Sequence, residues 1–168
     1  MKIYTKTGDN GETGLYDGSR VQKSEQIFDL LGALDELSSH IGMLILHCKE
    51  KQYEVSFLRK TQQTLLNIGS IVATPNPRQG QKLPIISEED VSEIESYIDN
   101  MDNHLPILSV FILQGGKTLC ESQAHVCRCV TRRTEREMIK YGNVDEHIFK
   151  YMNRLSDYFF TLARYYSE

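Results

Sequence analysis

The chain lacks the features that mark membrane, exported and nucleic-acid-binding proteins. No apolar run reaches the roughly 20 residues that span a bilayer. The N-terminus, MKIYTKTGDNGETG, has neither the apolar core of a signal peptide nor an arginine-rich transit pattern. There is no basic tail and the formal net charge is -4, which argues against general affinity for nucleic-acid phosphates. We therefore expect a soluble protein that binds neither membrane nor nucleic acid.

Cysteine is scarce, and its spacing does not suit a zinc site. The four cysteines stand at positions 48, 120, 127 and 129 without a CxxC pair. Cys127 and Cys129 are too close on a helix to bridge each other. These spacings predict neither a structural zinc site nor a disulfide framework, and reduced thiols are typical of a cytoplasmic protein.

Several common catalytic motifs are also missing. The Walker A pattern GxxxxGK[ST] does not occur. The five histidines have no metal-ligand spacing and no partner for a serine or cysteine triad. We expect most of them to be structural or exposed.

What the sequence does contain is a series of stretches with helical periodicity. Apolar residues at this spacing predict five helices, over about 24–48, 53–73, 87–103, 117–141 and 145–166. Ser24 is expected to cap the first, Ser87 with Asp90 the third, and Gly142 to end the fourth. A length of 168 residues suits one domain. The predicted fold is all-α, a five-helix bundle with ferritin-like up-and-down packing that follows an irregular glycine-rich arm at 1–23.

Two stretches interrupt this pattern. Residues 74–86 hold three prolines and Gly80, so they are expected to form a connection. The segment Leu105–Leu113 is short and apolar and contains Pro106. It fits either a buried strand or an extended lead-in, and periodicity cannot decide between them.

The predicted fourth helix concentrates positive charge on one face. Arg128, Arg132 and Arg136 follow at i, i+4 and i+8 in the run RCVTRRTER, and like charges at this spacing repel. A solvated face with internal pairs, such as Arg132 with Glu135, is the ordinary explanation. The alternative is a bound anion, and arginines concentrated within an acidic chain favour a small polyanionic ligand.

The N-terminal run TKTGDNGETGL is suited to phosphate. Its glycines let backbone N–H groups approach a ligand, and its threonines add hydroxyl donors. Lys6 and Lys23 supply point charges. Taken alone, the run is a glycine-rich turn; together with the arginine face it indicates phosphate binding.

Polar residues accompany the apolar face of the last helix. Asn153, Asp157, Phe160 and Arg164 follow at i, i+4, i+7 and i+11. Hydrogen bonding between helices explains this seam as well as a ligand role does. Asp35 lies in the largely apolar run LGALDELSSHIG and is available to pair with an arginine.

Four ordered motifs together resemble one family, the PduO-type ATP:cob(I)alamin adenosyltransferases. They are TKTGDNGETGLYDGSRVQK, LGALDELSSHIG, FILQGGK, and HVCRCVTRRTER followed by YMNRLSDYFFTLARY. The resemblance covers Thr5 to Tyr165. It implies a homotrimer with active sites between subunits, and one departure is Gln114, where the family usually has proline before the glycine pair. A C-terminal lid is expected to be short or missing, because the chain ends at Glu168.

The resemblance also implies roles for individual residues. The residues it assigns to ATP are Thr5, Lys6, Thr7, Gly8, Gly11, Thr13, Lys23, Arg132, Glu135, Arg136 and Asn153, with Glu135 also serving Mg²⁺. It implies a pair between subunits formed by Asp35 and Arg128, and it assigns Phe111 to the lower face of the corrin. Phe160 is expected beside Phe111. Arg128, Arg132, Asp35 and Phe111 are thus the candidate catalytic residues.

The implied reaction transfers the 5′-deoxyadenosyl group of ATP to cob(I)alamin, which can be formed from cob(II)alamin, and releases triphosphate. A cobalamin reductase and an adenosylcobalamin-dependent enzyme are the implied partners. An alternative of a different class is a non-catalytic trimer that binds ATP or cobalamin and acts as a sensor or delivery protein. A helical bundle with surface arginines would not explain the TKTGDNGETG arm.

Overall fold

The computed structural model describes residues 3–4, 6–48 and 52–167. Within this part the chain forms helices and one small antiparallel sheet. The elements are β1 (Glu12–Gly14), β2 (Arg20–Gln22), α1 (Gln26–His47), α2 (Gln52–Val72), α3 (Glu88–Asp102), α4 (Leu119–Tyr141) and α5 (Glu146–Tyr165).

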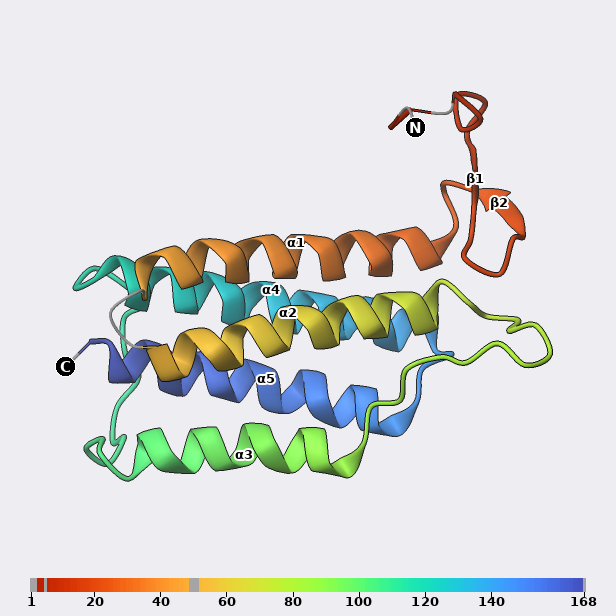
Figure 1. The fold of residues 1–168 in the computed structure, drawn as a ribbon. Coiled ribbons are helices and arrows are strands. Elements are labelled where there is room, and N and C mark those ends of the chain that lie inside the picture. Colours follow the sequence, from red (N-terminus) through yellow and green to blue (C-terminus); the bar gives the residue numbers. More distant parts are fainter. Residues whose placement is uncertain (1–2, 5, 49–51, 168) are drawn as a thin grey trace.

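The five helices run alternately up and down a single bundle (Figure 1). α4 packs against α1 and α5, α5 also packs against α3, and α1 packs against α2. The predicted all-α bundle is therefore confirmed. The glycine-rich arm lies at the end where α1 begins, and the segment between α3 and α4 lies at the opposite end (Figure 1). None of the helices in the described residues is long and apolar enough to cross a bilayer.

An aromatic cluster joins three helices in the core. The ring of Phe57 on α2 stacks on Tyr97 of α3 with centroids 4.0 Å apart, and it meets the fully buried ring of Tyr158 on α5 at 4.8 Å. Full burial of a large apolar side chain stabilises a fold by about 1.5–3 kcal/mol. The apolar spacing that predicts the helices is thus the spacing that packs them.

Two of the three predicted helix ends are confirmed. The Asp90 carboxylate accepts a 2.9 Å hydrogen bond from the Ser87 N–H at the start of α3. Gly142 ends α4 in the left-handed conformation, with φ 77. The expected cap at Ser24 is wrong, because α1 begins at Gln26 and its N-cap, Glu25, makes no side-chain hydrogen bond. A backbone bond from Glu25 N–H to the Gln22 carbonyl closes a turn that leads directly from β2 into the helix.

The arm is more ordered than expected. Residues 12–14 and 20–22 pair as a short hairpin in which Thr13 lies opposite Val21. Three-residue strands are too short to show an alternating pattern, so the sequence did not reveal them. The expectation of a wholly irregular arm is therefore wrong for residues 12–22.

The expectation of four reduced thiols is also wrong. Cys48, just after α1, and Cys120, in the first turn of α4, form a disulfide with a Cα–Cα distance of 5.8 Å. These cysteines are 72 residues apart in sequence, and it is the packing of α1 on α4 that brings them together. Cys127 and Cys129 remain free.

We expect the two free cysteines to differ strongly in reactivity. Burial raises the pKa of Cys127 to about 12, so at neutral pH it holds almost no thiolate, the form that reacts. Cys129 is exposed. Iodoacetamide under non-reducing native conditions should therefore label Cys129 and spare Cys127, as measured by peptide mass mapping. Labelling of Cys48 or Cys120 without a reductant would contradict the disulfide.

Candidate active site

The arginine face of α4 is held outward by the burial of the opposite face. Arg132 and Arg136 are exposed and Arg128 is half-buried. The helix start is fixed by a Thr-x-x-Glu capping box, in which Thr118 Oγ1 accepts from the Glu121 N–H at 3.0 Å. The opposite face is buried in the bundle through Cys120, Ala124, Cys127, Val130, Thr131, Thr134 and Met138. Since consecutive residues rise 1.5 Å, the face from Arg128 to Arg136 is about 12 Å long.

No carboxylate of the described chain neutralises this face. None of the ion pairs within residues 3–4, 6–48 and 52–167 includes Arg128, Arg132 or Arg136. Arg136 instead donates to the backbone carbonyl of Arg132 at 3.1 Å. The internal pair of Arg132 with Glu135, which would make an ordinary solvated face, is not formed. Three guanidiniums on one face are therefore available to an anion.

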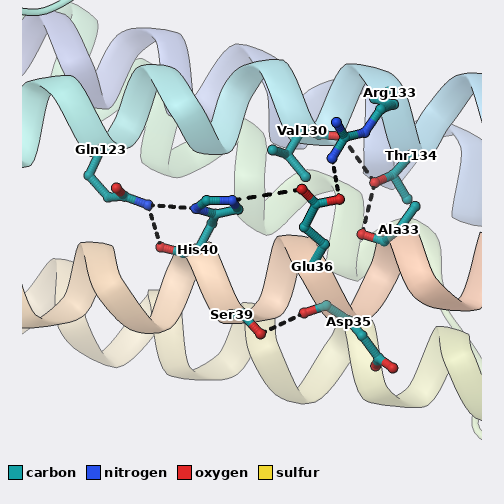
Figure 2. Close-up of polar contacts among 9 residues, drawn as sticks. All are labelled: Ala33, Asp35, Glu36, Ser39, His40, Gln123, Val130, Arg133 and Thr134. Carbon is teal, nitrogen blue, oxygen red and sulfur yellow. Dashed lines mark hydrogen bonds and ion pairs between the residues drawn. The ribbon is translucent and has the colours of Figure 1, made fainter.

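The neighbouring arginine has a different task. Arg133 forms an ion pair with Glu36 across the α1–α4 contact, and Glu36 Oε1 also lies 3.9 Å from His40 Nε2 (Figure 2). Gln123 of α4 donates to the His40 carbonyl at 2.9 Å. These contacts tie α4 to α1 and leave Arg133 outside the arginine face.

Glu135 and Asn153 meet between α4 and α5. Asn153 Nδ2 donates to Glu135 Oε1 at 3.2 Å. Arg154 holds the other end of the amide, because its Nη1 donates to Asn153 Oδ1 at 3.0 Å while its Nε binds Glu95 at 2.7 Å. The predicted magnesium-side acid and the predicted nucleoside-contacting amide are thus brought together.

Arg128 and Phe160 also meet, at the α4–α5 seam. The guanidinium carbon of Arg128 lies 5.3 Å from the centroid of the Phe160 ring, which is cation–π distance. The buried ring of His125 lies 6.5 Å from the same ring, and neither of its nitrogens has a hydrogen-bond partner among the described residues. Burial lowers the pKa of His125, partly opposed by Glu121. A neutral histidine side chain therefore lies near the Phe160 ring.

Phe111 lies in the segment between α3 and α4, and the structure removes the buried-strand alternative for that segment. Phe111 is fully exposed, as are Ile107 and Leu113 at 95% and 93%. The segment is therefore the extended lead-in. It surrounds a hollow of about 410 Å³ that also reaches Lys117, Glu121 and Arg164. A run of exposed apolar side chains of this kind marks a binding surface.

The base of this segment is anchored at both ends. At its start Arg164 donates to the Pro106 carbonyl and, at 3.1 Å, to Asp102. Arg164, one of the polar residues noted along the last helix, thus forms hydrogen bonds between structural elements. At its end Gly115 has φ 85, and a Cβ there would lie 2.9 Å from the Ser122 hydroxyl. Only glycine fits this turn without a shift of Ser122.

Asp35 faces another part of the surface. Its side chain is exposed on α1 and points away from the Glu36–Arg133 contact with α4 (Figure 2). It borders an apolar groove of about 400 Å³ between α1 and α2. Arg128 lies over Phe160 at the α4–α5 seam instead. The two residues do not pair within the described chain, and pairing between subunits stays a prediction.

The arm residues are gathered around the hairpin. Thr5 lies outside the described residues. Lys6 has φ 61 and Gly11 φ 82, both left-handed. A Cβ at Gly8 would lie 3.2 Å from Lys23 Nζ, so this lysine sits against the glycine. The Thr7 carbonyl accepts from Arg20 Nη2 at 2.8 Å, and Thr13 is the central residue of β1.

Sequence reasoning missed four residues that position these elements. The pattern Thr118-x-x-Glu121 is a capping signal that could have been read from the sequence. Arg20, which donates to the arm, and Arg78, which contacts it from the α2–α3 connection, carried no local signal. Their partners are backbone carbonyls brought close only by folding.

The described residues form a helical bundle with an arginine face on α4 and an exposed apolar segment between α3 and α4. A profile of the family described as cobalamin adenosyltransferase matches residues 3–166. The chain therefore belongs to the cobalamin adenosyltransferase family.

Individual relatives agree with this assignment. Corrinoid adenosyltransferase MMAB of Homo sapiens is 42% identical over 171 residues, covering 98% of this chain and 68% of the human protein. Corrinoid adenosyltransferase of Bacillus subtilis (strain 168) is 39% identical, covering 98% and 86%. A phenylalanine-to-alanine variant of a PduO-type ATP:corrinoid adenosyltransferase from Lactobacillus reuteri, solved with cobalamin and ATP, has a TM-score of 0.91 and 34% identity over 99% of this chain and 93% of that chain.

Proposed function

We propose that this protein transfers the 5′-deoxyadenosyl group of ATP to the cobalt of cob(I)alamin, and that the arginine face of α4 binds the triphosphate. One observation carries the assignment of the site. An arginine face without an acidic partner in the described chain lies on the same helix that follows the exposed Phe111 segment. One helix thus joins a region suited to polyphosphate to a region suited to the apolar face of a corrin.

In the reaction the substrate supplies the nucleophile. The electron pair of cobalt(I) forms a bond to C5′ of ATP while the C5′–O bond breaks, and its electrons leave with triphosphate; cobalt ends as cobalt(III). The reaction therefore needs no covalent nucleophile and no general base from the protein. The tasks of the protein are to align the two substrates and to stabilise charge on the departing triphosphate.

The ATP site is assigned to the arm and to the C-terminal part of the arginine face of α4. Backbone N–H groups around the arm glycines and the charges of Lys6 and Lys23 suit phosphate oxygens. Arg132 and Arg136 offer planar forks for bidentate contacts. Asn153, oriented by Arg154 and Glu135, is assigned to the nucleoside. The remaining arm contacts are Thr5, Thr7, Gly8, Gly11 and Thr13.

Magnesium fits this site only with help from ATP. No group of three acidic, histidine or cysteine side chains in the described residues could hold a metal. Glu135 Oε1 accepts from Asn153, which leaves its second oxygen for a cation. Mg²⁺ usually binds one or two carboxylates plus substrate phosphates, so Glu135 would hold it together with the triphosphate, whose charge it would partly neutralise.

The corrin is assigned to Phe111, Phe160, Arg128 and Asp35. Asp35 and Arg128 do not pair within the described chain. In the homotrimer implied by the resemblance, Asp35 of one copy would pair with Arg128 of a neighbouring copy. A reductase would have to supply cobalt(I), and an adenosylcobalamin-dependent enzyme would use the product.

A direct assay tests the proposed function. The purified protein is mixed with ATP, Mg²⁺ and chemically reduced cobalamin, and formation of adenosylcobalamin is followed by absorbance and triphosphate by chromatography. We expect equimolar adenosylcobalamin and triphosphate, and no product without ATP. Binding of both substrates without turnover would instead support the sensor or delivery alternative.

The pair between subunits can be measured by a double-mutant cycle. Asp35→Arg and Arg128→Asp should each slow the corrin-side reaction, because each places like charges opposite one another. The charge-swapped double variant should recover part of the loss. Strict additivity in kcat/KM for cobalamin would show that the residues do not interact, and a monomer by sedimentation under assay conditions would exclude a shared site.

A further inference from the structure

The arm is attached to the body of the protein through the connection between α2 and α3. Arg78 in this connection donates to the backbone carbonyl of Asp17 from Nη2 at 2.9 Å and from Nε at 3.2 Å. Next to it, the Tyr16 N–H donates to the Ala73 carbonyl at 2.9 Å, just beyond the end of α2. Two adjacent arm residues are thus bound to two points on either side of residues 74–77.

The turn of the arm is built to present that carbonyl. Asp17 Oδ1 accepts from the Ser19 hydroxyl at 2.6 Å and from the Ser19 N–H at 2.8 Å. These two bonds lower the pKa of Asp17, and Arg78 adds a smaller effect in the same direction, so the carboxylate stays ionised. Backbone bonds between Leu15 and Ser19 at 2.8 Å and between Gly18 and Leu15 at 3.0 Å complete the turn.

Two observations favour glycine at position 18 of this turn. Its φ of +90 is a backbone conformation that residues with a side chain rarely adopt. In addition, a Cβ at this position would lie 2.4 Å from Arg78 Nη2. A side chain at position 18 would therefore require the Arg78 guanidinium to shift.

From the turn, contacts continue to the residues assigned to phosphate. Arg20, at the start of β2, donates to the Thr7 carbonyl at 2.8 Å and lies 3.6 Å from Glu12. The Lys23 N–H, just after β2, donates to the Gly11 carbonyl at 2.8 Å. The orientation of the hairpin thus sets where the backbone of residues 7–11 lies.

We infer that Arg78 is a positioning residue for the ATP-binding arm, and that it holds the hairpin on the end of α2 so that Lys6, Gly8 and Lys23 meet the triphosphate already in place. The inference rests on the proposed function of the arm. An arm that is ordered before the ligand arrives loses less conformational entropy on binding. An arginine suits this task because two of its N–H groups can share one carbonyl.

The test compares Arg78→Gln with a matched control, Arg59→Gln. Arg59 is an exposed arginine on α2, and within the described residues it donates only to Gln62 of its own helix, at 3.1 Å. We expect Arg78→Gln to raise KM for ATP roughly 5- to 20-fold, as for loss of a charge-assisted hydrogen bond. kcat at saturating ATP and KM for cobalamin should stay near wild type. Arg78→Lys, which keeps one donor, should recover part of the ATP affinity.

Two readouts independent of turnover accompany the kinetics. Equilibrium binding of ATP without corrinoid should weaken by the same factor. Hydrogen exchange of residues 6–23 should accelerate in Arg78→Gln and not in Arg59→Gln, with the helices unaffected. Gly18→Ala should harm ATP binding less in the Arg78→Gln background than alone, because part of its effect is the contact with Arg78.

The outcomes separate this inference from the proposed function. If the wild-type protein binds no ATP, the proposed ATP-binding function of the arm is wrong. If wild type binds ATP and Arg78→Gln matches Arg59→Gln in KM for ATP and in arm exchange, Arg78 does not position the arm. A lower melting temperature of Arg78→Gln, with equal losses in kcat and in affinity for cobalamin, would show a general structural effect. That result would also overturn the inference.

Discussion

Replacement of Phe111 with alanine is expected to slow adenosylation on the order of 100-fold, about 2.7 kcal/mol of activation free energy. In the proposed site its ring excludes a lower axial ligand from cobalt. Cob(II)alamin without that ligand accepts an electron more easily, so the ring would favour formation of the cobalt(I) nucleophile. Loss of the ring would restore the ligand and disfavour the cobalt(I) nucleophile.

The exposure of Phe111 makes this test clean. A buried phenylalanine replaced by alanine would cost about 3–5 kcal/mol of stability. Phe111 is fully exposed, so the variant should melt at the wild-type temperature and should still bind ATP. This exposure excludes a core role for Phe111 in the described chain.

The decisive measurement is the spectrum of cob(II)alamin bound in the presence of ATP. Wild type should give the spectrum of a complex without a lower ligand, and Phe111→Ala that of a complex that keeps one. Leu113→Ala is the matched control, because Leu113 is 93% exposed on the same segment. Identical spectra from wild type and Phe111→Ala would remove Phe111 from catalysis.

Replacement of Arg132 with lysine is expected to lower kcat/KM for ATP at least ~10-fold, about 1.4 kcal/mol. Lysine keeps the charge but loses the planar fork that binds two phosphate oxygens together. Because no ion pair of the described chain includes Arg132, the substitution breaks no salt bridge and the fold should be unaffected.

Arg133→Lys is the control for this experiment. Arg133 pairs with Glu36 across helices, and lysine can keep that pair, so most activity should remain. Wild-type turnover in Arg132→Lys would exclude Arg132 from the triphosphate site. Equal losses in both variants would show that the effect is not specific to Arg132.

The helices could be predicted from the sequence because their determinants are local. Apolar spacing, the Ser87–Asp90 contact and Gly142 act within a few residues, and the structure confirms them. The cap at Ser24 failed because a backbone bond from Glu25 to Gln22 decides where α1 begins. The hairpin at 12–22 was missed because its strands are stabilised by pairing, which short segments do not show in advance.

The disulfide is a further feature that local sequence signals could not predict. Spacing rules for cysteine concern neighbours in sequence, whereas Cys48 and Cys120 are 72 residues apart. Only the packing of α1 on α4 brings them within bonding distance. The contact of Arg78 with Asp17 belongs to the same class, because its acceptor is a backbone carbonyl 61 residues away.

By itself, the sequence determined the all-α class, the arginine face at i, i+4 and i+8, and the residues that resemble the family's site, because helical geometry and motif order are properties of the chain alone. Only the tertiary structure decided which charges were already neutralised. Arg133 pairs with Glu36, while Arg128, Arg132 and Arg136 have no ion pair within the described residues. Whether a guanidinium is structural or free for a ligand depends on which helix packs beside it, and that contact is set by the whole fold.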